Sequence, residues 1–142
     1  GTQYSYEDLS TIARGQLELE DGAAASLAER DEGAMLSGDP ILFIDTDLYV
    51  MKVWSEYVFG RCETWILNAI VARHYDGYLL CRTDLPWAKD ELREYPDLAT
   101  RERLYHLYKD ILVNQPVPWV EIGGQAGERL QNAVEAVGRL LH

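Results

Sequence analysis

The stretch PILFIDTDLYVMKVW, residues 40–54, decides the fold because its hydrophobic pattern changes twice. The apolar run 41–44 shows no alternation, which predicts a strand covered on both faces, as in a parallel sheet. Asp45, Thr46 and Asp47 follow directly. An amphipathic pattern then predicts a helix that ends near Gly60. The stretch therefore predicts a buried strand whose carboxyl end leads into a helix.

The rest of the chain alternates between helical and extended patterns. Glycines and a proline predict a turn over residues 33–40. Apolar faces predict helices over residues 5–32, 48–60, 65–70, 104–111 and 130–141. Short apolar runs predict strands over residues 78–81 and 117–122. This alternation predicts an α/β fold with a parallel sheet and right-handed crossovers. We expect one domain over residues 1–142, with about three strands and flanking helices.

Composition and charge exclude several classes of protein. The sequence has 13 lysine and arginine residues against 24 aspartate and glutamate residues, a net charge of -11. This charge opposes binding to nucleic acid and to anionic membranes. No segment resembles a membrane span or a signal peptide. Because Cys62 and Cys81 are the only cysteines, a reduced protein is favoured over a disulfide scaffold, and we expect a cytoplasmic location.

Ligands of open parallel sheets bind at the carboxyl ends of strands, here directly after Ile44, Cys81 and Ile122. Two interpretations of Asp45 and Asp47 are open from the residues alone. A carboxylate at a strand end can hold magnesium beside a triphosphate. Alternatively, Asp47 caps the following helix and Asp45 bonds to a backbone amide.

Basic side chains follow the strand predicted at residues 78–81. Arg82, Lys89 and Arg93 could close over phosphates, because guanidinium groups offer paired donors to phosphoryl oxygens. The alternative is a solvated helix whose charges face water. Trp87, in the same segment, either packs on a core or stacks on a base.

No segment fits a Walker phosphate loop. Residues 33–38 have its glycine spacing, but Asp39 and Pro40 stand where lysine and serine or threonine are required. The three histidines lack metal-ligand spacing, and no histidine adjoins either cysteine. The residues therefore speak against a histidine metal centre and against a cysteine nucleophile.

Ordered motifs along most of the chain resemble the ribosylnicotinamide kinase domain of bacterial NadR-type proteins. The motifs are Gln3-Tyr4-Ser5, Ile12-Ala13-Arg14-Gly15-Gln16, Phe43-Ile44-Asp45-Thr46-Asp47 and Pro86-Trp87-Ala88-Lys89-Asp90-Glu91-Leu92-Arg93. The strand and helix predicted from residue 117 onward agree. The resemblance implies an incomplete three-layer fold of the P-loop kinase type, built on a parallel sheet. It also implies a kinase that transfers the γ-phosphoryl group of ATP to nicotinamide riboside in NAD biosynthesis, with ATP and Mg²⁺ as cofactors.

The resemblance also implies roles for particular residues. Asp45 would hold magnesium, Asp47 would support it or contact substrate, and Arg93 would close over the transferring group. The residues implied in nucleotide or substrate binding are Trp87, Asp90, Arg82 and Arg14.

The sequence departs from the family in two places. The tryptophan loop normally continues Asp-Gly-x-Arg, whereas here it reads Asp90-Glu91-Leu92-Arg93, so a turn that glycine would ease carries a side chain. The family also begins with a strand, a Walker loop, a helix and a second strand, all of which would precede Gly1. We therefore expect the C-terminal part of a P-loop kinase domain, about two thirds of it, inactive alone.

In the family, the first strand lies centrally in the sheet, between the strands that correspond to residues 41–44 and 78–81. Without that strand, two sheet edges would be exposed. We expect the strands at 41–44 and 78–81 to pair with each other, or a second copy to fill the gap and form a homo-oligomer. Two other functions stay open: another P-loop small-molecule kinase or NTPase, because fold does not fix function, and a non-catalytic binding or assembly module that docks at a sheet edge.

Overall fold

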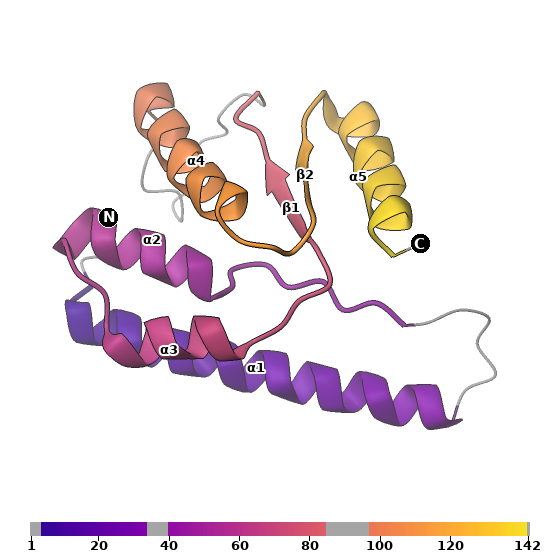
Figure 1. Ribbon diagram of the computed structural model, residues 1–142, viewed down its shortest axis with the longest axis horizontal. Helices are drawn as coiled ribbons and strands as arrows, with labels where there is room; N and C mark the ends of the chain where they lie inside the picture. The colour runs from indigo at the N-terminus through magenta and orange to yellow at the C-terminus, as the bar shows by residue number, and fades with distance from the viewer. Residues whose placement is uncertain (1–3, 34–39, 85–96, 142) are drawn as a thin grey trace. The chain divides into compact units, whose positions relative to one another are not determined.

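The computed structural model describes residues 4–33, 40–84 and 97–141, which form five α-helices and two β-strands. The described residues divide into two compact units, one within residues 4–71 and one within residues 72–141. We call them the helical unit and the strand unit and describe each by itself (Figure 1). The single domain expected from the sequence stays a prediction.

The helical unit contains α1 (Tyr6–Gly33), α2 (Leu48–Phe59) and α3 (Thr64–Ala72). A reciprocal cap starts α1: the Ser5 N–H donates to Asp8 Oδ2 at 2.8 Å, and the Asp8 N–H donates to Ser5 Oγ at 3.1 Å. Gly60 ends α2 in the left-handed conformation, with φ 72°, which glycine adopts without a Cβ clash. The sequence-based positions of these helices are confirmed.

Apolar side chains from all three helices form the core of the helical unit. Its buried members are Leu9, Ala13, Leu48, Met51 and Ile66. Leu48 and Met51 come from the first turns of α2. The part of residues 40–54 that contributes to the core is therefore its helical part.

The predicted strand at residues 41–44 is wrong. These residues have no regular secondary structure, and Phe43 is 67% exposed where a buried strand would hide it. A strand needs a neighbour to satisfy its N–H and C=O groups, and no described segment pairs with this one. The apolar run has the composition of a strand, but it lacks a pairing partner among the described residues.

The strand unit contains β1 (Tyr78–Cys81), α4 (Leu98–Val113), β2 (Trp119–Ile122) and α5 (Ala126–Leu140). The strands are parallel, with Tyr78 opposite Trp119 and Cys81 opposite Ile122. The helix α4 makes the connection between them, and Figure 1 shows α4 and α5 flanking the strands. The parallel arrangement and the position of β1 are confirmed, and β2 starts two residues later than predicted.

The sheet of the described residues contains two strands, against about three expected, so the structure is a mostly helical α/β fold. It is consistent with an incomplete P-loop-type fold, and the three-layer arrangement is not confirmed. Residues 78–81 pair with β2 and not with 41–44, so the expected pairing of those two segments is wrong. A homo-oligomer that fills the gap stays a prediction.

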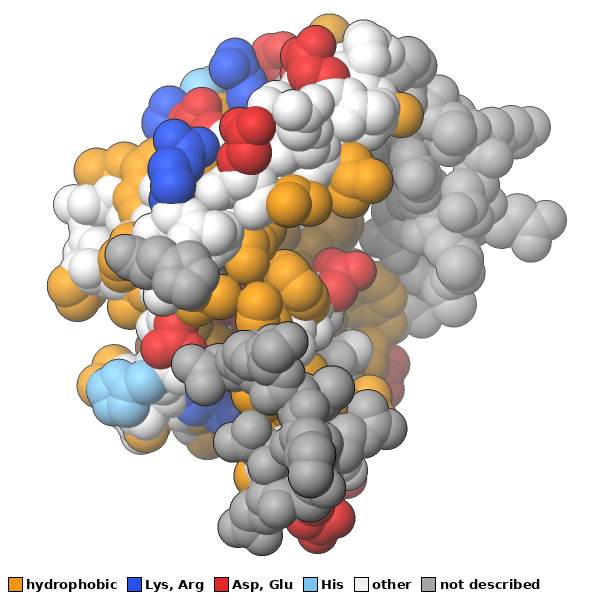
Figure 2. Space-filling model, turned by 90° about the vertical axis from the view of Figure 1, so that its right-hand side faces the viewer, with side chains coloured by type: hydrophobic (Ala, Val, Ile, Leu, Met, Phe, Trp, Pro, Cys, Tyr) orange, Lys and Arg blue, Asp and Glu red, His pale blue; other side chains and the backbone are white. Residues whose placement is uncertain are grey.

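The apolar stripe predicted on the last helix is largely exposed. Leu130 and Val134 are 68% and 64% exposed, while Ala136 is buried. Two strands offer α5 a narrow surface, so only one side of the helix is covered. Figure 2 shows hydrophobic side chains at the surface of the face it draws.

In residues 4–33, 40–84 and 97–141, no helix combines the length and the apolar composition needed to cross a membrane.

Candidate functional site

The carboxyl ends of β1 and β2 meet at one edge of the sheet, because the two strands are parallel and in register. Residues 82–84 leave β1 there, and Gly123 and Gly124 leave β2. The Arg82 N–H still donates to the Ile122 carbonyl at 2.8 Å, which extends the ladder by one bond. In open α/β sheets this edge is where ligands bind.

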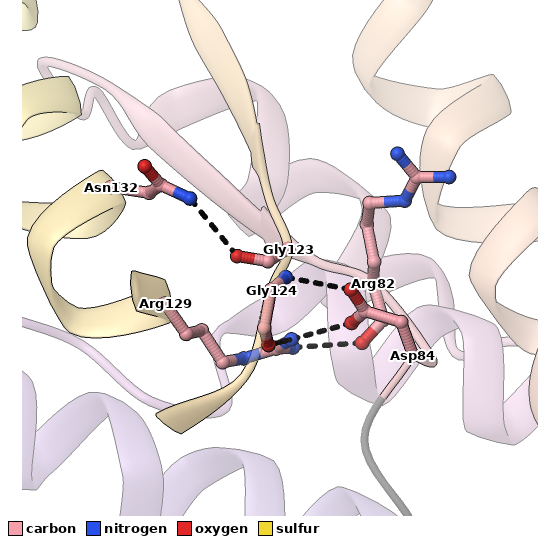
Figure 3. A network of polar contacts seen from close by, with 6 residues as sticks. All are labelled: Arg82, Asp84, Gly123, Gly124, Arg129 and Asn132. Atoms are coloured by element: carbon pink, nitrogen blue, oxygen red, sulfur yellow. Dashed lines mark hydrogen bonds and ion pairs between the residues drawn. The ribbon is translucent and has the colours of Figure 1, made fainter. Parts of the chain in front are cut away.

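A polar network ties the two strand ends together (Figure 3). Asp84 Oδ2 accepts from the Gly124 N–H at 2.6 Å, and Asp84 Oδ1 lies 2.6 Å from Arg129 Nη1. Arg129 Nη2 donates to the Arg82 carbonyl at 2.7 Å. One guanidinium group therefore holds both the carboxylate and the main chain of the segment that leaves β1.

The helix α5 supplies the side chains that reach this edge. Arg129 and Asn132 stand three residues apart, so they lie on the same side of the helix. Asn132 Nδ2 donates to the Gly123 carbonyl at 3.2 Å. Together the two side chains fix the Gly123-Gly124 turn against the first turns of α5.

A side chain at either glycine would be crowded, and at Gly124 it would also be strained. A Cβ on Gly123 would lie 3.0 Å from Arg82 Cδ and 3.0 Å from Asp84 Oδ2. Gly124 has φ +100°, a conformation that side-chain-bearing residues rarely adopt, and a Cβ there would also meet the Glu128 carboxylate. The segments that leave β1 and β2 thus approach more closely than other residues would allow.

The network keeps Asp84 ionised. The Gly124 N–H, and after it the Arg129 guanidinium, lower the pKa of Asp84 below its ordinary value. Arg129 is the better covered partner, because its side chain is 15% exposed against 41% for Asp84. The pair is therefore a charge-assisted contact at the rim of the sheet.

A second ion pair lies on β2 beside the same edge. Lys109 Nζ of α4 lies 2.7 Å from Glu121 Oε1. The hydrogen bond from Lys109 lowers the pKa of Glu121 the most. A hydrogen bond from Tyr105 and the charge of Arg82 lower the pKa further. Glu121 is thus satisfied by α4, and the exposed Arg82 side chain makes no ion pair within the described ranges.

Asp47 is the N-cap of α2, which confirms the capping interpretation for this residue. Its Oδ1 accepts from the Val50 N–H at 3.2 Å. Burial raises the pKa of Asp47, and the negative charge of Glu20 raises it further, against the opposing effect of the Val50 bond. Thr46 before it has φ 68°, and Asp45 is exposed.

The magnesium role of Asp45 stays a prediction. Within the parts of the chain that the structure describes, no group of three or more histidine, cysteine, aspartate or glutamate side chains is arranged to hold a metal ion. Mg²⁺ is commonly bound by one or two carboxylates together with waters and substrate phosphates. An exposed Asp45 fits that donor set only in the presence of a nucleotide.

The structure places Arg14 on the surface of the helical unit. Its guanidinium carbon lies 4.3 Å from the centroid of the Trp65 ring, a cation–π contact, and Trp65 Nε1 donates to Ser10 Oγ at 2.9 Å. Arg14 therefore has a structural contact, and its role in binding stays a prediction. The other candidates, Trp87, Asp90 and Arg93, lie outside the described residues.

Sequence reasoning named the position after Ile122 but missed the residues that meet there. The available signals were the Gly123-Gly124 pair directly after a predicted strand and an arginine in the following helix. Asp84 was visible as the acidic residue two places after Arg82. Their contact was hidden, because Asp84 and Arg129 are 45 residues apart in the chain.

A family model described as an AAA domain, AAA_28, matches residues 2–129. The chain belongs to this family. The AAA domain family is of the P-loop NTPase type, so the chain is assigned to the P-loop NTPase superfamily with a nucleotide-binding, kinase-like or NTPase function. The match covers residues 45–47, β1, β2 and Arg129. It does not single out the NadR-type proteins.

Proposed function

We propose that this AAA domain forms part of an ATP-dependent, magnesium-requiring kinase that phosphorylates nicotinamide riboside. The observation that carries the proposal is the family match over residues 2–129, which supplies the nucleotide chemistry. The ordered motifs that resemble ribosylnicotinamide kinases narrow the substrate to a nucleoside. The motifs at residues 43–47 and 86–93 contain most of the residues to which the resemblance assigns a role.

In the helical unit, Asp45 holds Mg²⁺ together with phosphate oxygens, and Asp47 fixes the start of α2 beside it. Arg82, which follows β1 at the carboxyl end of the strand, stabilises charge on the phosphoryl oxygens. Trp87, Asp90 and Arg93 contact the nucleoside or the transferring group, as the resemblance implies.

The proposal requires a phosphate-binding loop in addition to these 142 residues, because they contain no G-x-x-x-x-G-K-[ST] sequence. Kinases of this class hold the β- and γ-phosphates with such a loop and its lysine. We therefore expect ATP hydrolysis and transfer only when the chain is joined to a segment that supplies the loop.

The test is a kinase assay on the gene product that carries this chain, with ATP, Mg²⁺ and a panel of nucleosides. Nicotinamide riboside should be phosphorylated in preference to adenosine, uridine and cytidine. Equal or better turnover of another nucleoside would favour another P-loop kinase. If no nucleoside is phosphorylated but the gene product binds a protein partner, an assembly module would be favoured.

Substitution of Asp45 separates its proposed role from a general effect of charge. Asp45→Asn should lower kcat at saturating ATP by about 100-fold or more and raise the Mg²⁺ concentration needed for half-maximal rate, because a carboxylate ligand is lost. Asp76→Asn, at an exposed aspartate outside both motifs, is the matched control and should leave both values unchanged. A wild-type rate in Asp45→Asn would remove this residue from the mechanism.

A further inference from the structure

We propose that Asp84 and Arg129 are positioning residues that hold Arg82 at the carboxyl edge of the sheet, ready to meet the phosphates of a nucleotide. This assignment rests on the proposed function, because it deepens the role given there to Arg82. Neither Asp84 nor Arg129 is placed in contact with the ligand. Their role is to fix the main chain from which the Arg82 side chain projects.

The first step of the argument is the way in which the Arg82 backbone is held. Its N–H donates to the Ile122 carbonyl at 2.8 Å, and its own carbonyl accepts from Arg129 Nη2 at 2.7 Å. Asp84, two residues later, is held by Arg129 Nη1 and by the Gly124 N–H, each at 2.6 Å. Both sides of Arg82 are therefore fixed to β2 and α5.

The second step concerns the side chain of Arg82. Its Cδ atom lies where a Cβ on Gly123 would be only 3.0 Å away, so the aliphatic stem runs close over the glycine backbone. Figure 3 shows its guanidinium group directed away from Asp84 and Arg129. The network thus pairs the Arg129 charge with Asp84 and leaves the Arg82 guanidinium outside that pair.

The third step is electrostatic. With a net charge of -11 the chain as a whole repels anions, so a phosphate needs a local cation that is not neutralised by a carboxylate. Glu121, the acidic residue of β2, forms its ion pair with Lys109 and a hydrogen bond with Tyr105, and the Arg82 charge acts on it without an ion pair between the two. A forked guanidinium held at this edge matches the geometry of phosphoryl oxygens.

A double-mutant cycle on ATP affinity tests whether Asp84 acts through Arg82. Isothermal titration calorimetry with MgATP would be run on the full gene product and on Arg82→Ala, Asp84→Asn and the double variant. Arg82→Ala should weaken ATP binding by about tenfold, which corresponds to the loss of one charge-assisted hydrogen bond. Asp84→Asn should weaken it by about fivefold, because misplacement of a charged contact costs less than its removal.

The decisive value is the ATP affinity of the double variant. If Asp84 acts by positioning Arg82, the double variant binds ATP as Arg82→Ala does, because nothing is left to position. Independent losses that multiply to about fiftyfold would overturn the proposal, as would an unchanged affinity in Arg82→Ala or no ATP binding by the wild type. Arg129→Lys, which keeps the charge but loses the fork, should match Asp84→Asn.

A purely structural effect is measured by Asp97→Ala, which removes the N-cap of α4 in the same unit. This variant should lower stability without changing ATP affinity, and a loss of affinity equal to that of Asp84→Asn would contradict the positioning role. The proposed function can fail separately. If the double-mutant cycle shows coupling in ATP affinity but nicotinamide riboside is not phosphorylated, only the kinase proposal is rejected. If nicotinamide riboside is phosphorylated but the two losses of ATP affinity are independent, only the positioning role is rejected.

Discussion

Residues 41–47 and 78–84 have the same local pattern and different structures. Each begins with a short run that is largely apolar, Ile-Leu-Phe-Ile or Tyr-Leu-Leu-Cys, and each ends in a charged residue, threonine and aspartate. The second run is β1, hydrogen-bonded along its length to β2. The first run has no strand partner in the described residues and is largely exposed. A strand is therefore decided by what lies beside it as well as by its own residues.

The two terminal aspartates differ in the same way. Asp47 turns back onto its own helix and caps α2, and burial raises its pKa. Asp84 reaches across to the loop after β2, and the Gly124 N–H and Arg129 lower its pKa. Burial disfavours the charged form of Asp47 despite its local hydrogen bond, whereas the Gly124 N–H and Arg129 favour the charged form of Asp84.

The largest difference should be seen when an apolar side chain is truncated in each region. Ile122, at the carboxyl end of β2, is 3% exposed, and Ile122→Ala should cost about 2–5 kcal/mol of unfolding free energy through the lost burial and the cavity. Phe43→Ala should change stability by less than about 0.5 kcal/mol, because the side chain is exposed. Urea unfolding followed by circular dichroism measures both.

A cost for Phe43→Ala as large as that for Ile122→Ala would break the comparison. It would mean that residues 41–44 are covered in solution, by a second copy or by a segment that supplies the missing strand. Measuring the cost at two protein concentrations separates these, because only coverage by a second copy depends on concentration.

The next largest effect concerns the close approach at the edge of β1 and β2. Gly124→Ala should destabilise by about 1–3 kcal/mol, because a side chain is forced to a φ of +100°. Gly138→Ala, in the last turn of α5 with open space around it, is the control and should be neutral or stabilise by up to about 1 kcal/mol through helix propensity. Equal effects of the two substitutions would show that the Gly124 turn is not maintained in solution.

Local features were predictable from the sequence because their causes are local. The Ser5 and Asp8 cap, the end of α2 at Gly60 and the bounds of β1 each depend on a few neighbouring residues. Pairing was not predictable in the same way, because Tyr78 and its partner Trp119 are joined only by the folded sheet.

The candidate site shows the same limit. The sequence indicated that polar residues after strands are the ones to weigh, and Arg82 does lie at the carboxyl edge of β1. It did not indicate that Asp84 and Arg129 bond to each other, since helix α5 has to be in place for that contact. The expected strand end at Asp45 was wrong for a related reason: its apolar run matched a strand, but pairing is a tertiary property.

A smaller effect distinguishes the cap from the charge of Asp47. Asp47→Ala should cost about 1 kcal/mol, because the Val50 N–H loses its acceptor. Asp47→Asn keeps a capping oxygen and removes a carboxylate whose ionised form is disfavoured by burial, so at neutral pH it should be at least as stable as the wild type. If Asn destabilises as much as Ala, the charge itself is needed, which would favour a functional role over a cap.

The pH dependence of the two aspartates should have opposite signs. The folded pKa of Asp84 lies below the ordinary value of 3.8, so its contribution is present above that value and is lost as pH falls through the folded pKa. The folded pKa of Asp47 lies above 3.8, so its contribution is present below that value and is lost as pH rises through the folded pKa. Unfolding free energies of the wild type, Asp84→Asn and Asp47→Asn, measured from pH 7 downward, report both signs.

As pH falls, the advantage of the wild type over Asp84→Asn should shrink, while the wild type should gain on Asp47→Asn. Both variants are Asp-to-Asn changes in one chain, so each serves as the control for the other. Curves that shift in the same direction would show that the two carboxylates have similar surroundings in solution. The contrast between a locally capped aspartate and one held by a neighbouring strand would then have to be abandoned, because opposite surroundings require opposite proton linkage.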